Sequence, residues 1–169
     1  NNIGNSYRKK AQIKLASESY QKAIKISPDY FDAQCNLGRC LAIENKNEDA
    51  RLIYEKITQK EPQNIGYKIS YAYILLKLKE TNDAESIFKE IISLSPISVE
   101  AYNGLGLCDV EKKCLNQAKS NFRKAIEIDN SNVEAINNLG MVLLEERNYD
   151  EAVNCFKNAI KLNCLMLMI

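Results

Sequence analysis

The sequence predicts an all-α protein built from repeated antiparallel helix pairs. The first observation is a 34-residue period, which places glycines at Gly4, Gly38, Gly106 and Gly140, with the missing step falling on Ala72. The second is an alanine at the same spacing, at Ala16, Ala50, Ala84, Ala118 and Ala152. The third is an aromatic ring four residues later, at Tyr20, Tyr54, Phe88, Phe122 and Phe156. Such fixed spacing indicates five copies of one structural repeat.

The boundaries of the repeats follow when each repeat is numbered so that its glycine stands at position 8. Residues 1–169 then form one array, with repeats at about 1–30, 31–64, 65–98, 99–132 and 133–164 and a tail at 165–169. Apolar residues recur every three or four positions, which is typical of amphipathic helices. We predict a first helix at positions 2–14 and a second at 17–30. Short polar turns join the two, and proline at position 32 ends the second helix at Pro28, Pro62 and Pro96.

Composition excludes several classes of function. The formal net charge is +1, so the chain lacks the basic field of a nucleic-acid-binding protein. No apolar run approaches the ~20 residues of a membrane helix, and no signal peptide is visible. The chain has no histidine, no Walker or Rossmann glycine motif and no CxxC pair. We therefore predict a non-enzyme without cofactor or metal, which binds neither nucleic acid nor membrane.

Six cysteines suggest a reducing compartment. Cys40 and Cys108 occupy the same position two repeats apart, too far for a disulfide, and Cys35 and Cys40 point to different faces of one helix. Reduced thiols favour the cytoplasm. The sequence begins with Asn1 inside a repeat, so we interpret the chain as a fragment of a longer protein.

These positions resemble the tetratricopeptide repeat (TPR) family. Its 34-residue units favour glycine at position 8, a large apolar residue at 11, alanine at 20, an aromatic at 24 and proline at 32. The resemblance covers essentially the whole chain, although Asp109 takes the usually apolar position 11, and Gln34 and Lys68 take position 4, which is often aromatic in the family. The resemblance implies a right-handed superhelical solenoid of antiparallel helix pairs. It also implies that first helices line a concave groove that binds a protein or peptide.

Positions 2, 5, 6, 9, 12 and 13 are expected to face this groove. Several of these positions carry asparagine, whose side-chain carboxamide offers both hydrogen-bond donors and acceptors to the backbone of an extended peptide. The candidate binding residues are Asn2, Asn5, Asn36, Arg39, Ser70, Tyr73, Asn103, Leu107, Asn137, Asn138 and Met141.

Two interpretations of the position-6 asparagines stay open. The sequence is similar to the repeats of nucleocytoplasmic O-GlcNAc transferases, whose asparagine ladder holds peptide backbone, at Asn2, Asn36 and Asn138. It departs from that ladder at Ser70 and Gly104. In the other interpretation, the asparagines only solvate helix surface in an asparagine-rich chain.

The charged side chains along the expected groove restrict which peptides can bind there. The family's two-carboxylate clamp needs cations where this chain has Asn1, Gly66 and Ser70, so we predict no binding of chaperone EEVD peptides. Arg39 stands towards the N-terminal end and Glu145 towards the C-terminal end. A partner segment with acidic residues at one end and basic residues at the other would complement this order.

The leading hypothesis is a protein–protein interaction module or scaffold within a multiprotein complex, binding an extended peptide or partner segment in a concave groove. One alternative is the substrate-recognition repeat domain of a larger enzyme, similar in layout to glycosyltransferases. Another is a self-assembling structural repeat protein. The last hypothesis arises because the final repeat has no polar cap and residues 165–169 are apolar, which leaves homo-oligomerisation through this edge open.

Overall fold

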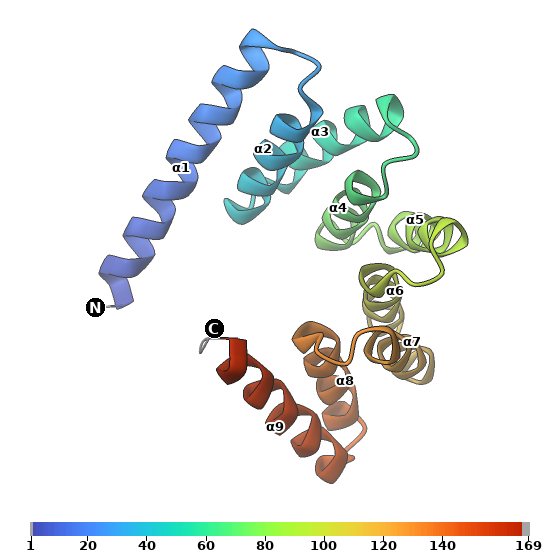
Figure 1. Cartoon of the computed structure of the whole chain (residues 1–169). Helices are drawn as coiled ribbons and strands as arrows, with labels where there is room; N and C mark the ends of the chain where they lie inside the picture. The colour runs from blue at the N-terminus through green and yellow to red at the C-terminus, as the bar shows by residue number, and fades with distance from the viewer. Residues whose placement is uncertain (1, 167–169) are drawn as a thin grey trace. The chain divides into compact units, whose positions relative to one another are not determined.

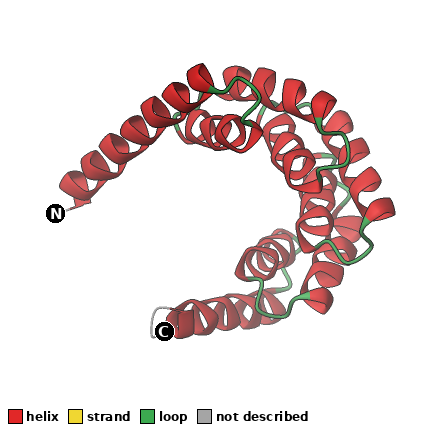
Figure 2. Ribbon diagram, turned by 45° about the horizontal axis from the view of Figure 1, so that its top comes forward, coloured by secondary structure: helices red, strands yellow, loops and turns green. Residues whose placement is uncertain are grey.

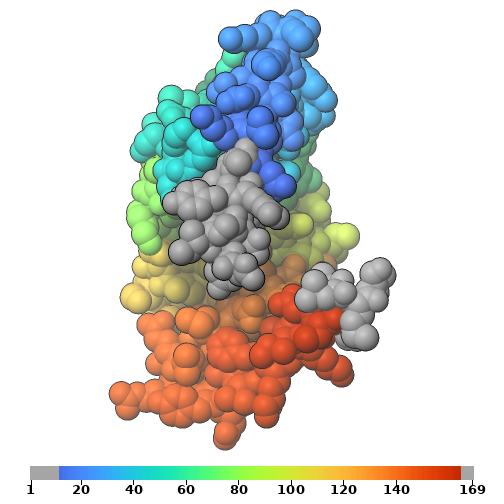
Figure 3. Space-filling view, turned by 90° about the vertical axis from the view of Figure 1, so that its left-hand side faces the viewer, coloured from blue at the N-terminus to red at the C-terminus, as the bar shows by residue number. Residues whose placement is uncertain are grey.

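In a computed structural model, the backbone is described for residues 2–166 and the side chains for residues 12–164 (Figure 3). This part of the chain contains helices joined by short loops and no strand (Figure 2). The helices, labelled in Figure 1, are α1 Asn2–Ile26, α2 Phe31–Ile43, α3 Asn47–Lys60, α4 Ile65–Lys77, α5 Thr81–Leu94, α6 Val99–Glu111, α7 Leu115–Ile128, α8 Val133–Glu145 and α9 Tyr149–Met166. The all-α repeat fold predicted from the sequence is thus confirmed.

Helix boundaries repeat with the sequence period. The second helices α3, α5 and α7 cover positions 17–30, as predicted, and the first helices cover positions 1–13, one residue earlier than predicted. The early start of α4, α6 and α8 follows from the residue at position 34, because Asn64, Ser98 and Asn132 cap these helices; Tyr30 forms no such side-chain bond at the start of α2. Each cap oxygen accepts a hydrogen bond from the backbone N–H three residues on, at 3.2, 3.3 and 2.8 Å.

The prediction of a helix pair in the first repeat is wrong, because residues 2–26 form the single helix α1. In the other repeats the chain turns at position 15 with a positive φ, at Asn45, Lys79, Lys113 and Arg147. Repeat one has Ala11 at this position. Alanine is the strongest helix former and rarely adopts the left-handed conformation, so the helix continues through the expected turn.

Aromatic rings at position 24 pack against glycines at position 8 of the same repeat. A Cβ atom built on Gly38 would lie 2.8 Å from the Tyr54 ring, and one on Gly106 would lie 2.4 Å from the Phe122 ring. Tyr54 and Phe122 are 1% and 0% exposed. Glycine therefore permits a close approach of the paired helices.

Phe88 packs differently. Its repeat has Ala72 at position 8, and the Phe88 ring lies instead against Gly104, at position 6 of the following repeat. A Cβ atom on Gly104 would lie only 2.2 Å from the ring. In repeats two to five, the aromatic residue at position 24 thus lies against a glycine, either in its own repeat or in the next.

The chain divides into two compact units, residues 1–80 and 81–169. The boundary falls within the third repeat, whose first helix α4 ends the N-terminal unit and whose second helix α5 begins the C-terminal unit. Each unit has its own apolar core, centred on Tyr54 and Ile57 in the first and on Phe122 and Leu143 in the second. A single uninterrupted array over residues 1–169 stays a prediction.

Candidate functional site

A pocket of about 420 Å³ lies between the first helices α2 and α4 of the N-terminal unit. We name it the basic pocket, because its only charged lining residues are cations. It is lined by Arg39, Ala42, Ile43, Tyr54, Ile69, Ser70, Tyr73, Ile74 and Lys77.

Tyr54 from α3 lies at the inner side of the basic pocket. Its hydroxyl donates a hydrogen bond to the backbone oxygen of Cys35 at 3.0 Å, and burial raises the pKa of Tyr54, so the hydroxyl stays protonated. Arg39 and Lys77 are exposed, and Lys77 Nζ donates to the backbone oxygen of Ala42 at 3.4 Å. The pocket therefore joins an apolar interior to a positively charged rim.

A polar pocket of about 400 Å³ adjoins it, and Arg39 lines both. Its other lining residues are Asp32, Cys35, Asn36, Asn64, Gly66 and Tyr67. The Tyr67 hydroxyl donates to Asp32 Oδ1 at 2.8 Å, and burial, with that carboxylate, raises the pKa of Tyr67 to about 12. Both groups are thus occupied with each other, while Asn36 is half-buried at the surface.

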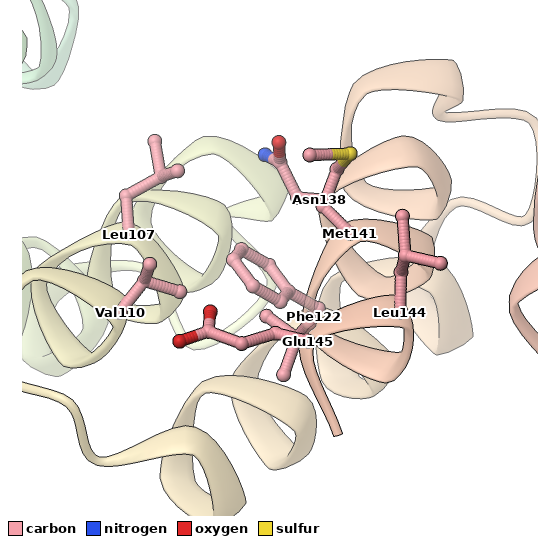
Figure 4. A pocket seen from close by; sticks show the side chains of 8 residues that line it. Leu107, Val110, Phe122, Asn138, Met141, Leu144 and Glu145 are labelled. Carbon is pink, nitrogen blue, oxygen red and sulfur yellow. The ribbon is translucent and has the colours of Figure 1, made fainter. Parts of the chain in front are cut away.

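The C-terminal unit has a pocket of about 320 Å³ between α6 and α8 (Figure 4). We name it the acidic pocket, because Glu145 is its only charged lining residue. It is otherwise lined by Leu107, Val110, Phe122, Asn138, Met141, Val142 and Leu144. Met141 and Leu144 are 59% and 43% exposed, so the pocket carries apolar side chains that a partner can reach.

The basic and acidic pockets are equivalent in the repeat. Both are lined by positions 9, 12 and 24 of one repeat and by positions 6, 9, 10 and 13 of the next. The sequence predicted positions 6, 9, 12 and 13, whereas positions 10 and 24 were missed because their apolar side chains were assigned to the core. Chemistry distinguishes the two pockets: Lys77 at position 13 of the first corresponds to Glu145 in the second.

Two of the predicted groove asparagines bind each other. Asn103 is 2% exposed, and its Oδ1 accepts a hydrogen bond from Asn138 Nδ2 at 2.9 Å. This bond links α6 to α8 and holds Asn138 at the edge of the acidic pocket. We therefore leave the buried Asn103 out of the residues that a partner would contact.

The other predicted residues are distributed over the three pockets. Ser70 and Tyr73 line the basic pocket with Arg39. Leu107 and Met141 line the acidic pocket. Asn137 is half-buried and lines none of the three pockets named here. The side chains of Asn2 and Asn5 lie outside the described residues. Contact of any of these residues with a partner stays a prediction.

The described residues contain neither a metal-binding cluster nor a helix able to span a membrane. No group of three or more histidine, cysteine, aspartate or glutamate side chains there is arranged to hold a metal ion. No helix over the same residues is both long enough and apolar enough to cross a membrane.

Family models match most of the chain. A model described as "TPR repeat" matches residues 4–42, and models described as "Tetratricopeptide repeat" match residues 66–98, 99–132 and 133–163. The chain belongs to the tetratricopeptide repeat family. The resemblance seen in the sequence is thereby confirmed. No curated protein matches the chain by sequence.

Solved TPR structures share the fold at low sequence identity. A thermophilic TPR protein from Thermus thermophilus, TTC0263, is similar with a TM-score of 0.83 and 16% identity over 95% of this chain and 88% of that one. MamA from Desulfovibrio magneticus RS-1, residues 41 to the end, gives 0.72 and 18% over 96% and 92%. YrrB, described as a TPR protein with an unusual peptide-binding site, gives 0.62 and 21% over 95% and 83%. This TPR chain is therefore a helical-repeat protein-interaction scaffold.

Proposed function

We propose that this TPR protein is a non-enzymatic module that binds an extended peptide segment of a protein partner along its first helices. The observation that carries the proposal is the equivalence of the basic and acidic pockets, 68 residues apart at the same repeat positions. Each unit thus offers the same kind of pocket between two first helices, and a side chain of an extended segment fits such a pocket.

The chemistry of the pockets supports binding rather than catalysis. Apolar side chains predominate in both, including Ile69 and Tyr73 in the first and Leu107 and Met141 in the second. Few, well-placed polar groups in an apolar concave surface are typical of recognition sites. The net charge of +1 supports a protein partner rather than nucleic acid or an anionic membrane.

We also place the protein in the cytoplasm. Cys40 and Cys108 are buried at the same position of different repeats. Burial raises the pKa of Cys108 to about 12, so this thiol stays protonated and unreactive. Buried thiols of this kind act as small apolar residues in a reducing compartment.

The test is selection of peptides from a random library on the purified chain, followed by mapping of their contacts by amide chemical shifts. Selected peptides should change the amide chemical shifts of residues in α2, α4, α6 and α8. For the peptides that change the shifts of acidic-pocket residues, Met141→Glu should raise the dissociation constant at least tenfold. Leu52→Glu is the matched control, because Leu52 is also an exposed apolar side chain, 59% exposed, but lies on the second helix α3. Peptides that shift only α3, α5 and α7 would contradict the proposal.

Self-association at the C-terminal edge is a second candidate function. Val153 and Ile160 of α9 are 46% and 63% exposed and lie seven residues apart, on one face of the helix. The apolar residues 165–169, on which the sequence-based hypothesis depended, lie outside the described residues. Light scattering over a concentration series should show dimers that Ile160→Glu abolishes. A monomer at all concentrations would reject this candidate.

A further inference from the structure

We propose that the basic pocket is a specificity site for an acidic side chain beside a large apolar one within an extended partner segment. The apolar side chain enters between Ile69 and Tyr73, and the neighbouring aspartate or glutamate pairs with Arg39. This inference rests on the proposed function and adds the chemistry of the partner to it.

Arg39 is the central residue of the site, because it lines both the basic and the polar pocket. Among the described side chains, no carboxylate forms an ion pair with Arg39. Asp32, the carboxylate among the lining residues of the polar pocket, accepts the Tyr67 hydroxyl at 2.8 Å. An exposed guanidinium beside an apolar pocket offers a carboxylate two parallel hydrogen bonds without breaking an existing pair.

The second cation, Lys77, lies across the same pocket on α4. It lies near the C-terminal end of α2, since its Nζ reaches the Ala42 oxygen at 3.4 Å. The pocket is thus lined by two cations and no anion. Positive charge of this kind selects an acidic residue by complementarity and rejects a basic one by repulsion.

The carboxylate belongs to a side chain rather than to a chain terminus. Beyond Arg39, the polar pocket continues with the carboxamide of Asn36, with Asn64, whose Oδ1 caps α4, and with Gly66. Carboxamides bond backbone N–H and C=O groups of a passing segment. A segment that ended at Arg39 would leave this second pocket unused, so the bound chain runs on past the acidic residue.

The acidic pocket gives an internal comparison. It has the same repeat positions, but Leu107 replaces Arg39 at position 9 and Glu145 replaces Lys77 at position 13. Glu145 has only a solvent-exposed partner, Lys113 at 3.5 Å, which neutralises it weakly. A basic residue beside an apolar one should therefore bind here, with the opposite preference.

The experiment uses three blocked hexapeptides of glycine and serine with a central leucine–glutamate, leucine–glutamine or leucine–lysine pair. A fourth peptide ends in a leucine with a free carboxylate. Each is titrated at low salt into the isotope-labelled chain. Amides of Ser70, Tyr73 and Ile74 report the basic pocket, and those of Met141 and Val142 report the acidic pocket.

We expect the leucine–glutamate peptide to bind the basic pocket about two- to fivefold more tightly than the leucine–glutamine peptide, as one exposed ion pair provides. The difference should vanish in Arg39→Gln and in 1 M salt, where the screening length is about 3 Å. Lys56→Gln, which removes an exposed charge from α3, is the matched control and should keep the preference. The leucine–lysine peptide should shift the acidic pocket instead.

Contrary outcomes separate this inference from the proposed function. Equal binding of the glutamate and glutamine peptides at the basic pocket overturns the inference and leaves peptide binding in place. Tightest binding by the free-carboxylate peptide overturns the assignment to a side chain. If no probe shifts the basic pocket while library-selected peptides shift the first helices, only the inference fails. If neither probes nor selected peptides shift those helices, both fail.

Discussion

Gly104→Ala tests whether the Phe88 ring needs the glycine of the following repeat. The added methyl carbon would lie 2.2 Å from Phe88 Cζ and within 2.5 Å of two further ring carbons. Favourable carbon–carbon contacts are about 3.5–4.0 Å, so the overlap exceeds 1 Å. Phe88 is 0% exposed, and its ring therefore cannot move aside without displacing other core side chains.

Two opposing effects set the size of the change. Overpacking of a well-packed core costs about 1–3 kcal/mol, and the large overlap puts this site in the upper half of that range. Alanine in place of glycine within a helix contributes about 1 kcal/mol in the other direction, and Gly104 lies in the middle of α6. We expect the free energy of unfolding to fall by about 1–2 kcal/mol.

Urea denaturation followed by circular dichroism measures this change, and hydrogen exchange in α5 and α6 locates it. Gly66→Ala is the matched control, because its Cβ would meet only Asn64 Oδ1, at 3.3 Å, and should change stability by less than about 1 kcal/mol. Phe88→Leu should partly relieve Gly104→Ala, so that the double variant loses less stability than the sum of the single ones.

Equal effects of the two glycine substitutions would refute the reasoning, because they would show that helix propensity decides both. Additive effects of Gly104→Ala and Phe88→Leu would also refute it, since residues in direct contact should be coupled.

Three further predictions concern charges and turns. Burial raises the pKa of Asp109, so the ionised carboxylate lowers the free energy of unfolding above that pKa, and this loss is recovered as the pH falls through it. The Asp109→Asn variant should therefore have a higher melting temperature than the native chain at pH 7. This difference in melting temperature should disappear in acid. Arg147 has a φ of 62°, and Arg147→Gly should stabilise the chain by about 0.5–1 kcal/mol in urea denaturation, whereas a loss would show that the turn is unstrained. Lys119 and Glu146 pair at 2.5 Å with both side chains largely buried. Glu146→Lys should lower the free energy of unfolding by about 1 kcal/mol, and adding Lys119→Glu should restore most of this loss. If the second substitution restores nothing, the pair does not contribute to stability.

The sequence predicted the helix pairs, because they depend on small, aromatic and apolar residues at fixed spacing. It did not predict the single helix α1, although Gly4, Ala16 and Tyr20 fit the repeat, since the turn depends on position 15 alone. At that position the left-handed residues are asparagine, lysine, lysine and arginine, which share no turn-forming chemistry. The first repeat differs from the others in having alanine at this position, at residue 11, and the high helix propensity of alanine continues the helix through the expected turn.

Position 6 shows why the proposed asparagine ladder is interrupted. This position lies beside the aromatic residue of the preceding repeat: Phe88 lies against Gly104, while Tyr54 and Ser70 line one pocket together. Phe122 packs against Gly106 of its own repeat, and the space beside it holds Asn138.

The glycine at position 6 of the fourth repeat is therefore required by how the Phe88 ring packs, before any requirement of a ligand. Where the ring packs against its own repeat, position 6 of the next repeat can carry a carboxamide. Where the ring packs against the next repeat, only glycine fits at position 6 of that repeat. Asn138 in turn donates to the buried Asn103, so even the carboxamide that remains also joins two helices. We therefore expect recognition by the first helices to depend less on a continuous ladder of asparagines than on the charged and apolar side chains at positions 9 and 13, which the packing leaves free to vary.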